Sequence, residues 1–125
     1  MASQSYSKPK LRIKGLKTPA LKHDHFRVGD TVFAEDVAFE GNAGSKSRPV
    51  VFLGYQGNMA RYVKCTTSTA SRAPLIPVGD PISAGLGKDT YIEPVVRYIE
   101  VDKLNYRLGH LSEEDLQNLR EHIAR

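Results

Sequence analysis

The sequence lacks the cysteines and long apolar runs that characterise several classes of small protein. Its 125 residues include one cysteine, Cys65, and no tryptophan. One cysteine excludes an internal disulfide, and with His23 and His25 in a tail too few ligands remain for a closed zinc site. No stretch approaches the roughly 20 apolar residues that cross a bilayer, and the first thirty residues lack the apolar run of a secretory signal. We therefore expect a cytoplasmic protein with no metal, no cofactor and no membrane partner.

Acidic residues are nearly missing from residues 1–25, where six Lys and Arg side chains face Asp24 alone. The other hundred residues are almost balanced, so the net charge of +4 belongs to this first segment. Pro9, Gly15 and Pro19 interrupt it, and it has no sustained period. We expect a flexible basic arm, which either lies along a phosphate backbone or an acidic partner, or is a solvated leader.

The remaining residues, 26–125, are expected to form one mainly β domain. Apolar residues make up 40% of the chain and charged residues 26%, which is a globular balance. Short runs rich in β-formers predict five strands joined by turns, with a tight hairpin at Gln56, Gly57 and Asn58. These strands are expected at residues 28–39, 48–55, 59–68, 74–78 and 90–100. Five short strands favour a small antiparallel barrel over a parallel arrangement.

Two local signals refine this prediction. Pro94 lies in the middle of the last strand, where a missing N–H indicates a bulge or an unpaired edge. Ser112 is a helix cap, with Asp115 at the third helical position of a capping box, so a helix is expected at about 113–124. Its apolar residues recur at helical spacing and should pack on the barrel.

Two short segments contain the residues best suited to bind phosphate. We call them the basic step and the hydroxyl run. The basic step comprises Lys46, Ser47, Arg48 and Pro49, and the hydroxyl run covers residues 66–69. In a hairpin turning at Gly57, residues whose numbers sum to about 114 face one another, so Arg48 lies opposite Thr66 and next to Thr67. A guanidinium beside hydroxyls binds phosphate well. The alternative is a surface salt bridge for Arg48 and a plain β-branched strand end for the threonines.

These residues and their order resemble the MazF/PemK family of bacterial endoribonuclease toxins. The shared features begin with Gly29-Asp30 opening the first strand and the arginine-proline step at Arg48-Pro49. They continue with the strand ending in Cys65-Thr66-Thr67 and with Arg97-Tyr98-Ile99, Leu104 and Gly109-His110-Leu111-Ser112. The similarity runs from about Val28 to the C-terminus.

The resemblance implies an SH3-like antiparallel barrel of the CcdB/MazF type with a C-terminal helix, and a homodimer. It also implies metal-independent cleavage of single-stranded RNA to 2′,3′-cyclic phosphate and 5′-hydroxyl ends, and neutralisation by an acidic antitoxin peptide. Arg48 and Thr67 match the family's catalytic pair. The residues expected to bind substrate around them are Lys46, Ser47, Thr66, Ser68 and Arg97. Tyr55, Tyr62 and Tyr91 either stack on bases or lie half-buried in the barrel.

The chain departs from the family at two acidic positions. Residues 41–44 replace a loop that carries a glutamate in many relatives, and Pro94 stands where others have a catalytic aspartate. Glu93 is the nearest candidate acid or base, and a bulge at Pro94 would bring it into place. The alternative function is therefore a non-catalytic RNA- or protein-binding module on the same fold.

Overall fold

The computed structural model describes residues 26–38, 45–68 and 74–123 of the chain. The basic arm expected at residues 1–25 lies outside the described residues, as do the departing loop at 41–44 and Thr69 of the hydroxyl run.

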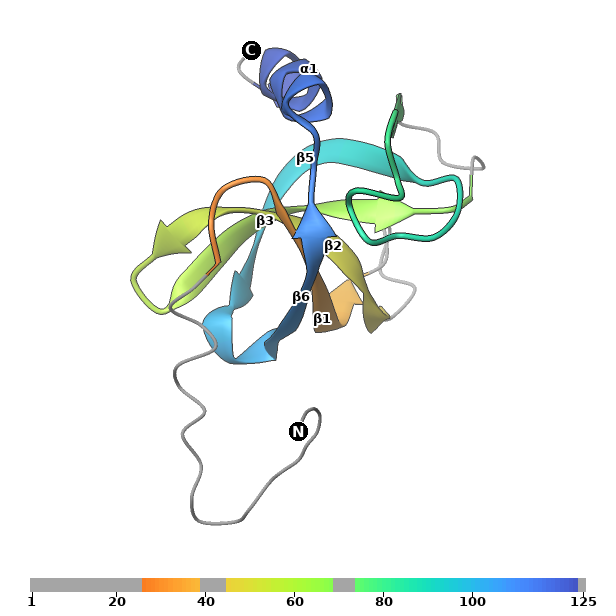
Figure 1. Cartoon of the computed structure of the whole chain (residues 1–125). Helices are drawn as coiled ribbons and strands as arrows, with labels where there is room; N and C mark the ends of the chain where they lie inside the picture. The colour runs from red at the N-terminus through yellow and green to blue at the C-terminus, as the bar shows by residue number, and fades with distance from the viewer. Residues whose placement is uncertain (1–25, 39–44, 69–73, 124–125) are drawn as a thin grey trace.

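The described residues form one strongly curved antiparallel sheet with a single helix packed across it (Figure 1). Six strands lie in the order β4-β5-β3-β2-β1-β6. The elements are β1 (Asp30–Ala38), β2 (Ser45–Gln56), β3 (Met59–Thr66), β4 (Ile76–Pro77), β5 (Tyr91–Glu100), a 3-10 turn (Val101–Lys103), β6 (Leu104–His110) and α1 (Glu113–Ile123). The expectation of a mainly β fold with a C-terminal helix is confirmed. No helix in the described part of the chain has the length and apolar character needed to cross a membrane.

Strand β6 is the element that the sequence does not predict. It pairs antiparallel with β1, with Tyr106 opposite Phe33 and His110 opposite Asp30. Of its seven residues only Leu104 is buried, so its sequence carries little apolar alternation. The strand forms because the edge of β1 offers unpaired backbone groups, and this tertiary context overrides weak local propensity.

Shifts in register interrupt the four long strand ladders and bend the sheet. The largest lies in β5, where Glu93 faces Lys64 and Arg97 faces Tyr62. The three residues between Glu93 and Arg97 therefore lie opposite the single residue Val63. The irregularity predicted at Pro94 is confirmed, and its physical reason is the missing proline N–H.

The two faces of the sheet carry separate apolar clusters, as strand alternation requires. Val51, Val63 and Cys65 belong to the cluster that packs against α1. Their neighbours in sequence belong to the opposite cluster, among them Val50 and Tyr62. Leu116 and Leu119 are buried in the first cluster and Ile123 packs against it, so the prediction that the helix packs on the barrel is confirmed.

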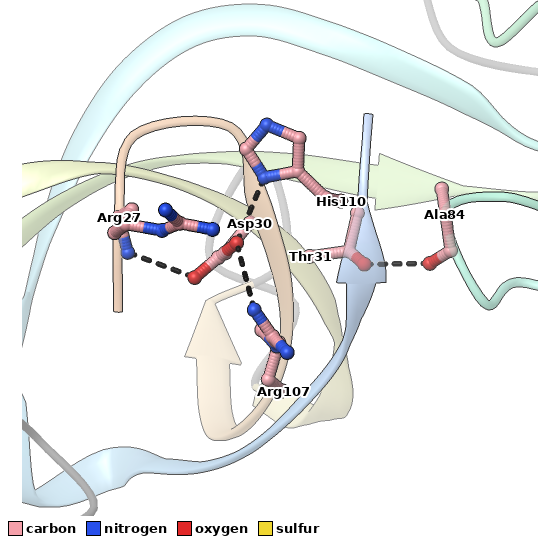
Figure 2. Close-up of polar contacts among 6 residues, drawn as sticks. All are labelled: Arg27, Asp30, Thr31, Ala84, Arg107 and His110. Carbon is pink, nitrogen blue, oxygen red and sulfur yellow. Dashed lines mark hydrogen bonds and ion pairs between the residues drawn. The ribbon is translucent and has the colours of Figure 1, made fainter. Parts of the chain in front are cut away.

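A fully buried carboxylate, that of Asp30, joins the start of β1 to β6 (Figure 2). One oxygen accepts the backbone N–H of Arg27 at 2.8 Å, and the other lies 2.8 Å from His110 Nδ1 and 3.7 Å from an Arg107 nitrogen. The next residue, Thr31, donates its hydroxyl to the carbonyl of Ala84 at 2.6 Å. These contacts attach both the edge strand and the loop before β5 to the start of β1.

Asp115 takes part in the predicted helix cap through its backbone N–H, whereas its carboxylate binds elsewhere. Ser112 caps the helix as expected, because its hydroxyl accepts the backbone N–H of Asp115 at 3.1 Å. The carboxylate of Asp115 instead accepts the N–H groups of Gly79 and Asp80 at 2.8 and 3.0 Å. This carboxylate therefore ties the helix to the segment that follows β4.

Replacing Asp115 with alanine is expected to destabilise the fold. Two partly buried N–H groups would lose their acceptor, which typically costs about 1–3 kcal/mol in the free energy of unfolding. Urea unfolding measures this cost. Glu114→Ala is the matched control, because it removes the same charge from the same turn at an exposed position, and we expect a change within about 0.5 kcal/mol. Equal losses in the two variants would contradict the assigned contacts.

Candidate nucleic-acid interface

A groove of about 360 Å³ lies where β2 begins and β3 ends. It is lined by residues from β1, β2, β3, the two residues that follow β3 and the segment before β5. These are Phe33, Lys46, Ser47, Arg48, Pro49, Cys65, Thr66, Thr67, Ser68, Leu86, Lys88 and Thr90. All seven described residues of the basic step and the hydroxyl run are among them.

Strand register explains why the basic step and the hydroxyls meet. Val50 pairs with Lys64, Val51 with Val63 and Phe52 with Tyr62. The two residue numbers of each pair sum to 114, so the register expected from a turn at Gly57 is confirmed along this part of the hairpin. Continued two residues beyond the paired region, this register points from Arg48 to Thr66, the last residue of β3, and both residues line the groove. Thr67 follows immediately and is exposed.

The end of β3 is shaped by a local turn. The hydroxyl of Thr66 accepts the backbone N–H of Ser68 at 3.1 Å. Such side-chain to backbone bonds stop a strand from continuing, because they satisfy N–H groups that a ladder would otherwise use. Thr67 lies between these two residues, at a bend rather than on a regular strand.

The lining of the groove is cationic and rich in hydroxyls. Lys46, Arg48 and Lys88 supply three positive groups. Five hydroxyls come from Ser47, Thr66, Thr67, Ser68 and Thr90, and no carboxylate is among the described lining residues. Cations and hydrogen-bond donors without a competing acid favour an anionic ligand, and a phosphate suits both kinds of donor.

Arg48 is a partly desolvated cation. Burial lowers the pKa of its guanidinium, and the nearby carboxylate of Glu93 is the largest influence that raises it again. A guanidinium that has lost hydration gains more from a hydrogen-bonding anion than one already surrounded by water. The position of Arg48 therefore favours ligand binding over a purely solvated role.

Glu93 and Arg97, both predicted in the site, lie beside the groove and not in its lining. Glu93 is only 2% exposed, and its carboxylate lies 3.5 Å from Lys64 Nζ and 3.7 Å from an Arg97 nitrogen. The structure brings these two predicted residues together with Lys64 in a charge cluster, in which Glu93 and Lys64 are buried and Arg97 is partly exposed. Its negative charge acts on Arg48 from the interior.

Six lining residues are absent from the predicted site, namely Phe33, Pro49, Cys65, Leu86, Lys88 and Thr90. One signal was available, since Thr66 pairs with Tyr91 and the same register brings Thr90 beside Thr67. The segment before β5, which carries Leu86 and Lys88, reaches the groove through close packing. The hydrophobic period of the sequence does not reveal such packing. At Gly85, with φ +74°, a Cβ would lie 2.1 Å from the carbonyl oxygen of Leu108, so only glycine allows this approach.

The described residues hold no group of three or more His, Cys, Asp and Glu side chains placed to bind a metal ion. Cys65 lies at the base of the groove but is only 2% exposed. Burial raises the pKa of its thiol to about 12, against the weaker opposing influence of Arg48. This agrees with the environment of a buried structural thiol rather than a nucleophile.

The native chain is therefore expected to react slowly with a thiol reagent at pH 8, because its single cysteine is held protonated and buried. In denaturing urea the same thiol should react rapidly, and absorbance of the released chromophore measures both rates. The raised pKa of the thiol also determines whether stability rises or falls with pH. The native state keeps its proton longer, so the free energy of unfolding should fall as pH rises from about 9 toward 12. Rapid modification without denaturant would contradict this description of Cys65.

Comparison with protein-family models and with curated proteins finds no match to the sequence. Several solved structures nevertheless share its fold. The Mycobacterium tuberculosis toxin MazF-mt6 matches with a TM-score of 0.58 at 21% identity, over 76% of this chain and 92% of that one. MazF from Deinococcus radiodurans matches with a TM-score of 0.61 at 13% identity, over 78% and 91%.

A third structure is an endoribonuclease from a mycobacterial species in complex with its cognate antitoxin. It matches with a TM-score of 0.54 at 14% identity, over 77% of this chain and 88% of that one. These likenesses cover most of each chain at low identity, so they establish architecture. The curved sheet, its six-stranded order and the terminal helix give this chain the fold of the MazF toxins.

Proposed function

We propose that this protein is a type II toxin that cleaves single-stranded RNA without a metal ion. The observation that carries the proposal is the meeting of Arg48 and Thr67 on one groove, whose described lining residues supply three cations and five hydroxyls and include no carboxylate. Fold similarity supports it, since MazF toxins and mycobacterial endoribonucleases are built on the same architecture.

The proposed reaction is an internal transesterification of RNA. A bond forms between the 2′-oxygen and phosphorus while the bond from phosphorus to the 5′-oxygen breaks. The 2′-hydroxyl loses a proton and the departing 5′-oxygen gains one, which leaves a 2′,3′-cyclic phosphate and a 5′-hydroxyl. Negative charge concentrates on the non-bridging oxygens as the fifth bond to phosphorus forms, so donors placed there accelerate the step.

The groove residues have different roles in the proposed reaction. Arg48 holds and neutralises the non-bridging oxygens, since its planar group donates two parallel hydrogen bonds. Thr67 donates its hydroxyl to the same phosphate. Lys46 and Lys88 attract the neighbouring phosphates, and the hydroxyls of Ser47, Thr66 and Ser68 add donors along the chain.

Glu93 has an indirect role in this proposal. Buried between Lys64 and Arg97, its carboxylate is poorly placed to take a proton from RNA in the groove. Its charge does act on Arg48 and favours the charged guanidinium. We therefore assign to Glu93 an electrostatic role, which is to stabilise the positive charge of Arg48 from the interior.

One observation favours a second candidate function. The described residues lining the groove include no carboxylate and no imidazole, the usual groups for general acid–base catalysis. A module that grips RNA without cutting it would have the same cations and hydroxyls. The two candidates differ in a single measurable property, which is strand cleavage.

The proposal includes two protein partners. A second copy of the chain would extend the RNA-binding surface, and an acidic antitoxin segment would neutralise the cations of the groove. The crystallised complex of a mycobacterial endoribonuclease with its cognate antitoxin, on the same fold, supports the second partner.

The purified chain is expected to cleave single-stranded RNA in the presence of EDTA. Arg48→Ala or Thr67→Val should lower the cleavage rate by about 10²–10³-fold, the typical effect of removing one donor to a developing oxyanion. Thr67→Ser keeps the hydroxyl and should recover most of the rate. Gel electrophoresis of end-labelled RNA measures the rates, and end-group analysis identifies the cyclic phosphate.

The matched control is Arg120→Ala, which removes an exposed arginine from α1 without touching the groove. Cleavage that needs a divalent metal, or that survives Arg48→Ala, would contradict the proposed mechanism. Binding without cleavage across RNAs of varied sequence would establish the second candidate function.

Lys88→Ala is expected to weaken RNA binding in a salt-dependent way. Each cation that neutralises a phosphate contributes about 0.7 to the slope of log K against log salt for a single strand. The slope should therefore fall by about that amount for an uncleavable oligonucleotide with 2′-deoxy residues, measured by fluorescence anisotropy. Lys103→Ala changes net charge equally, but Lys103 is paired with Asp36 at 2.9 Å and should leave the slope unchanged. Equal slopes in all three proteins would remove Lys88 from the RNA surface.

A further inference from the structure

Phe33 and Tyr106 form an aromatic pair on the side of the sheet that carries the groove. They lie opposite one another on β1 and β6. Their ring centroids are 5.5 Å apart and their planes differ by 16°, which is an offset stacked arrangement. The pair is independent of the cations and hydroxyls on which the proposed function depends.

The outer member of this pair is open to solvent. Tyr106 is 55% exposed, although one side of its ring rests on Phe33. Phe33 fixes the orientation of the tyrosine ring, so a further planar group could stack on it without first ordering a mobile side chain. An oriented, exposed aromatic face is suited to a flat ligand.

The aromatic pair borders the phosphate-binding groove. Phe33 is one of the groove-lining residues, and in the ladder it lies opposite Pro49, next to Arg48. Tyr106 lies one strand further, about 10 Å from β2 by the usual spacing of strands. A base attached next to a phosphate held by Arg48 and Thr67 would come close to these rings.

We propose that the aromatic pair of Phe33 and Tyr106 is a stacking site for one nucleobase of the bound RNA. The inference rests on the proposed function, because it needs a strand whose phosphate lies in the groove. Single-stranded nucleic acids are held by this combination of a cationic track and aromatic platforms. The groove beside the rings is cationic, and its described lining residues include no acid, which favours RNA over an apolar protein segment as the occupant of the rings.

The tyrosines that the sequence singled out for stacking lie elsewhere. Tyr62 is 3% exposed in the core, and Tyr55 packs edge-on against Phe52 with centroids 4.7 Å apart. Neither of them, nor Tyr91, lines the groove. The aromatic surface that does reach the groove comes from β1 and from β6, the strand missed by the sequence analysis.

The test is a binding cycle that combines protein and RNA changes. An uncleavable single-stranded oligonucleotide of mixed sequence, with 2′-deoxy residues, is prepared with an abasic site at each position in turn. Kd is measured for the wild type and for Tyr106→Leu. Tyr106→Leu should weaken binding of the intact strand by roughly fivefold to a hundredfold, the usual effect of losing one stacked base.

The coupling in this cycle identifies the site. In the wild type one abasic position should weaken binding by a similar factor, and in Tyr106→Leu that position should have no further effect. Tyr106→Phe keeps the ring and should restore the abasic penalty. Tyr98→Leu is the matched control, since Tyr98 is 51% exposed on β5 and is not a groove residue.

Three outcomes would overturn the inference, and they are distinguishable. Wild-type protein that binds no RNA would overturn the proposed function and this inference with it. RNA binding that is weakened by Arg48→Ala but not by Tyr106→Leu would overturn the stacking site alone. A change of sedimentation mass in Tyr106→Leu, with unchanged RNA affinity, would assign the aromatic pair to a contact between copies of the chain.

Discussion

The pairing register of β2 and β3 is the constraint on which the groove depends. With Val50 opposite Lys64, the start of β2 and the end of β3 lie at the same end of the hairpin. Arg48 therefore lies close to the hydroxyls. A slip of one residue would move every side chain of one strand to the other face of the sheet. The apolar clusters on both faces make such a slip costly, because Val50 and Val51 would each exchange one cluster for the other.

Three carboxylates lie in the interior of the molecule and not on its surface. Asp30, Glu93 and Asp115 are 0%, 2% and 8% exposed, and each has specific partners in the interior. Asp30 holds the β6 edge, Asp115 holds the segment after β4, and Glu93 lies between Lys64 and Arg97. These acids have internal contacts, and none of them is among the described residues that line the groove.

The fold was largely predictable because its main determinants are local. Strands rich in β-branched residues and the turn at Gly57 predict most elements, and that turn also predicts the register that brings Arg48 to Thr66. Strand β6 was not predictable from its own residues, because six of its seven side chains are not buried and its pairing with β1 determines its structure.

The predicted site residues lie together on one groove where a single hairpin carries them, and other elements add lining residues that were not predicted. Lys46 to Arg48 and Thr66 to Ser68 lie on that hairpin and do line the groove. Lys88 and Phe33 reach it through other elements, by contacts that no sequence period records. Glu93 illustrates the opposite case, since the bulge at Pro94 exists but leaves Glu93 in the interior with Lys64 and Arg97.

The central claim is that Arg48 and Thr67 grip the same phosphodiester linkage. A crystal structure with an RNA oligonucleotide made uncleavable by 2′-deoxy substitution tests it most directly. The account predicts one phosphate within hydrogen-bond distance of both the Arg48 guanidinium and the Thr67 hydroxyl. A strand bound along another face, with these two groups remote from every phosphate, would contradict it.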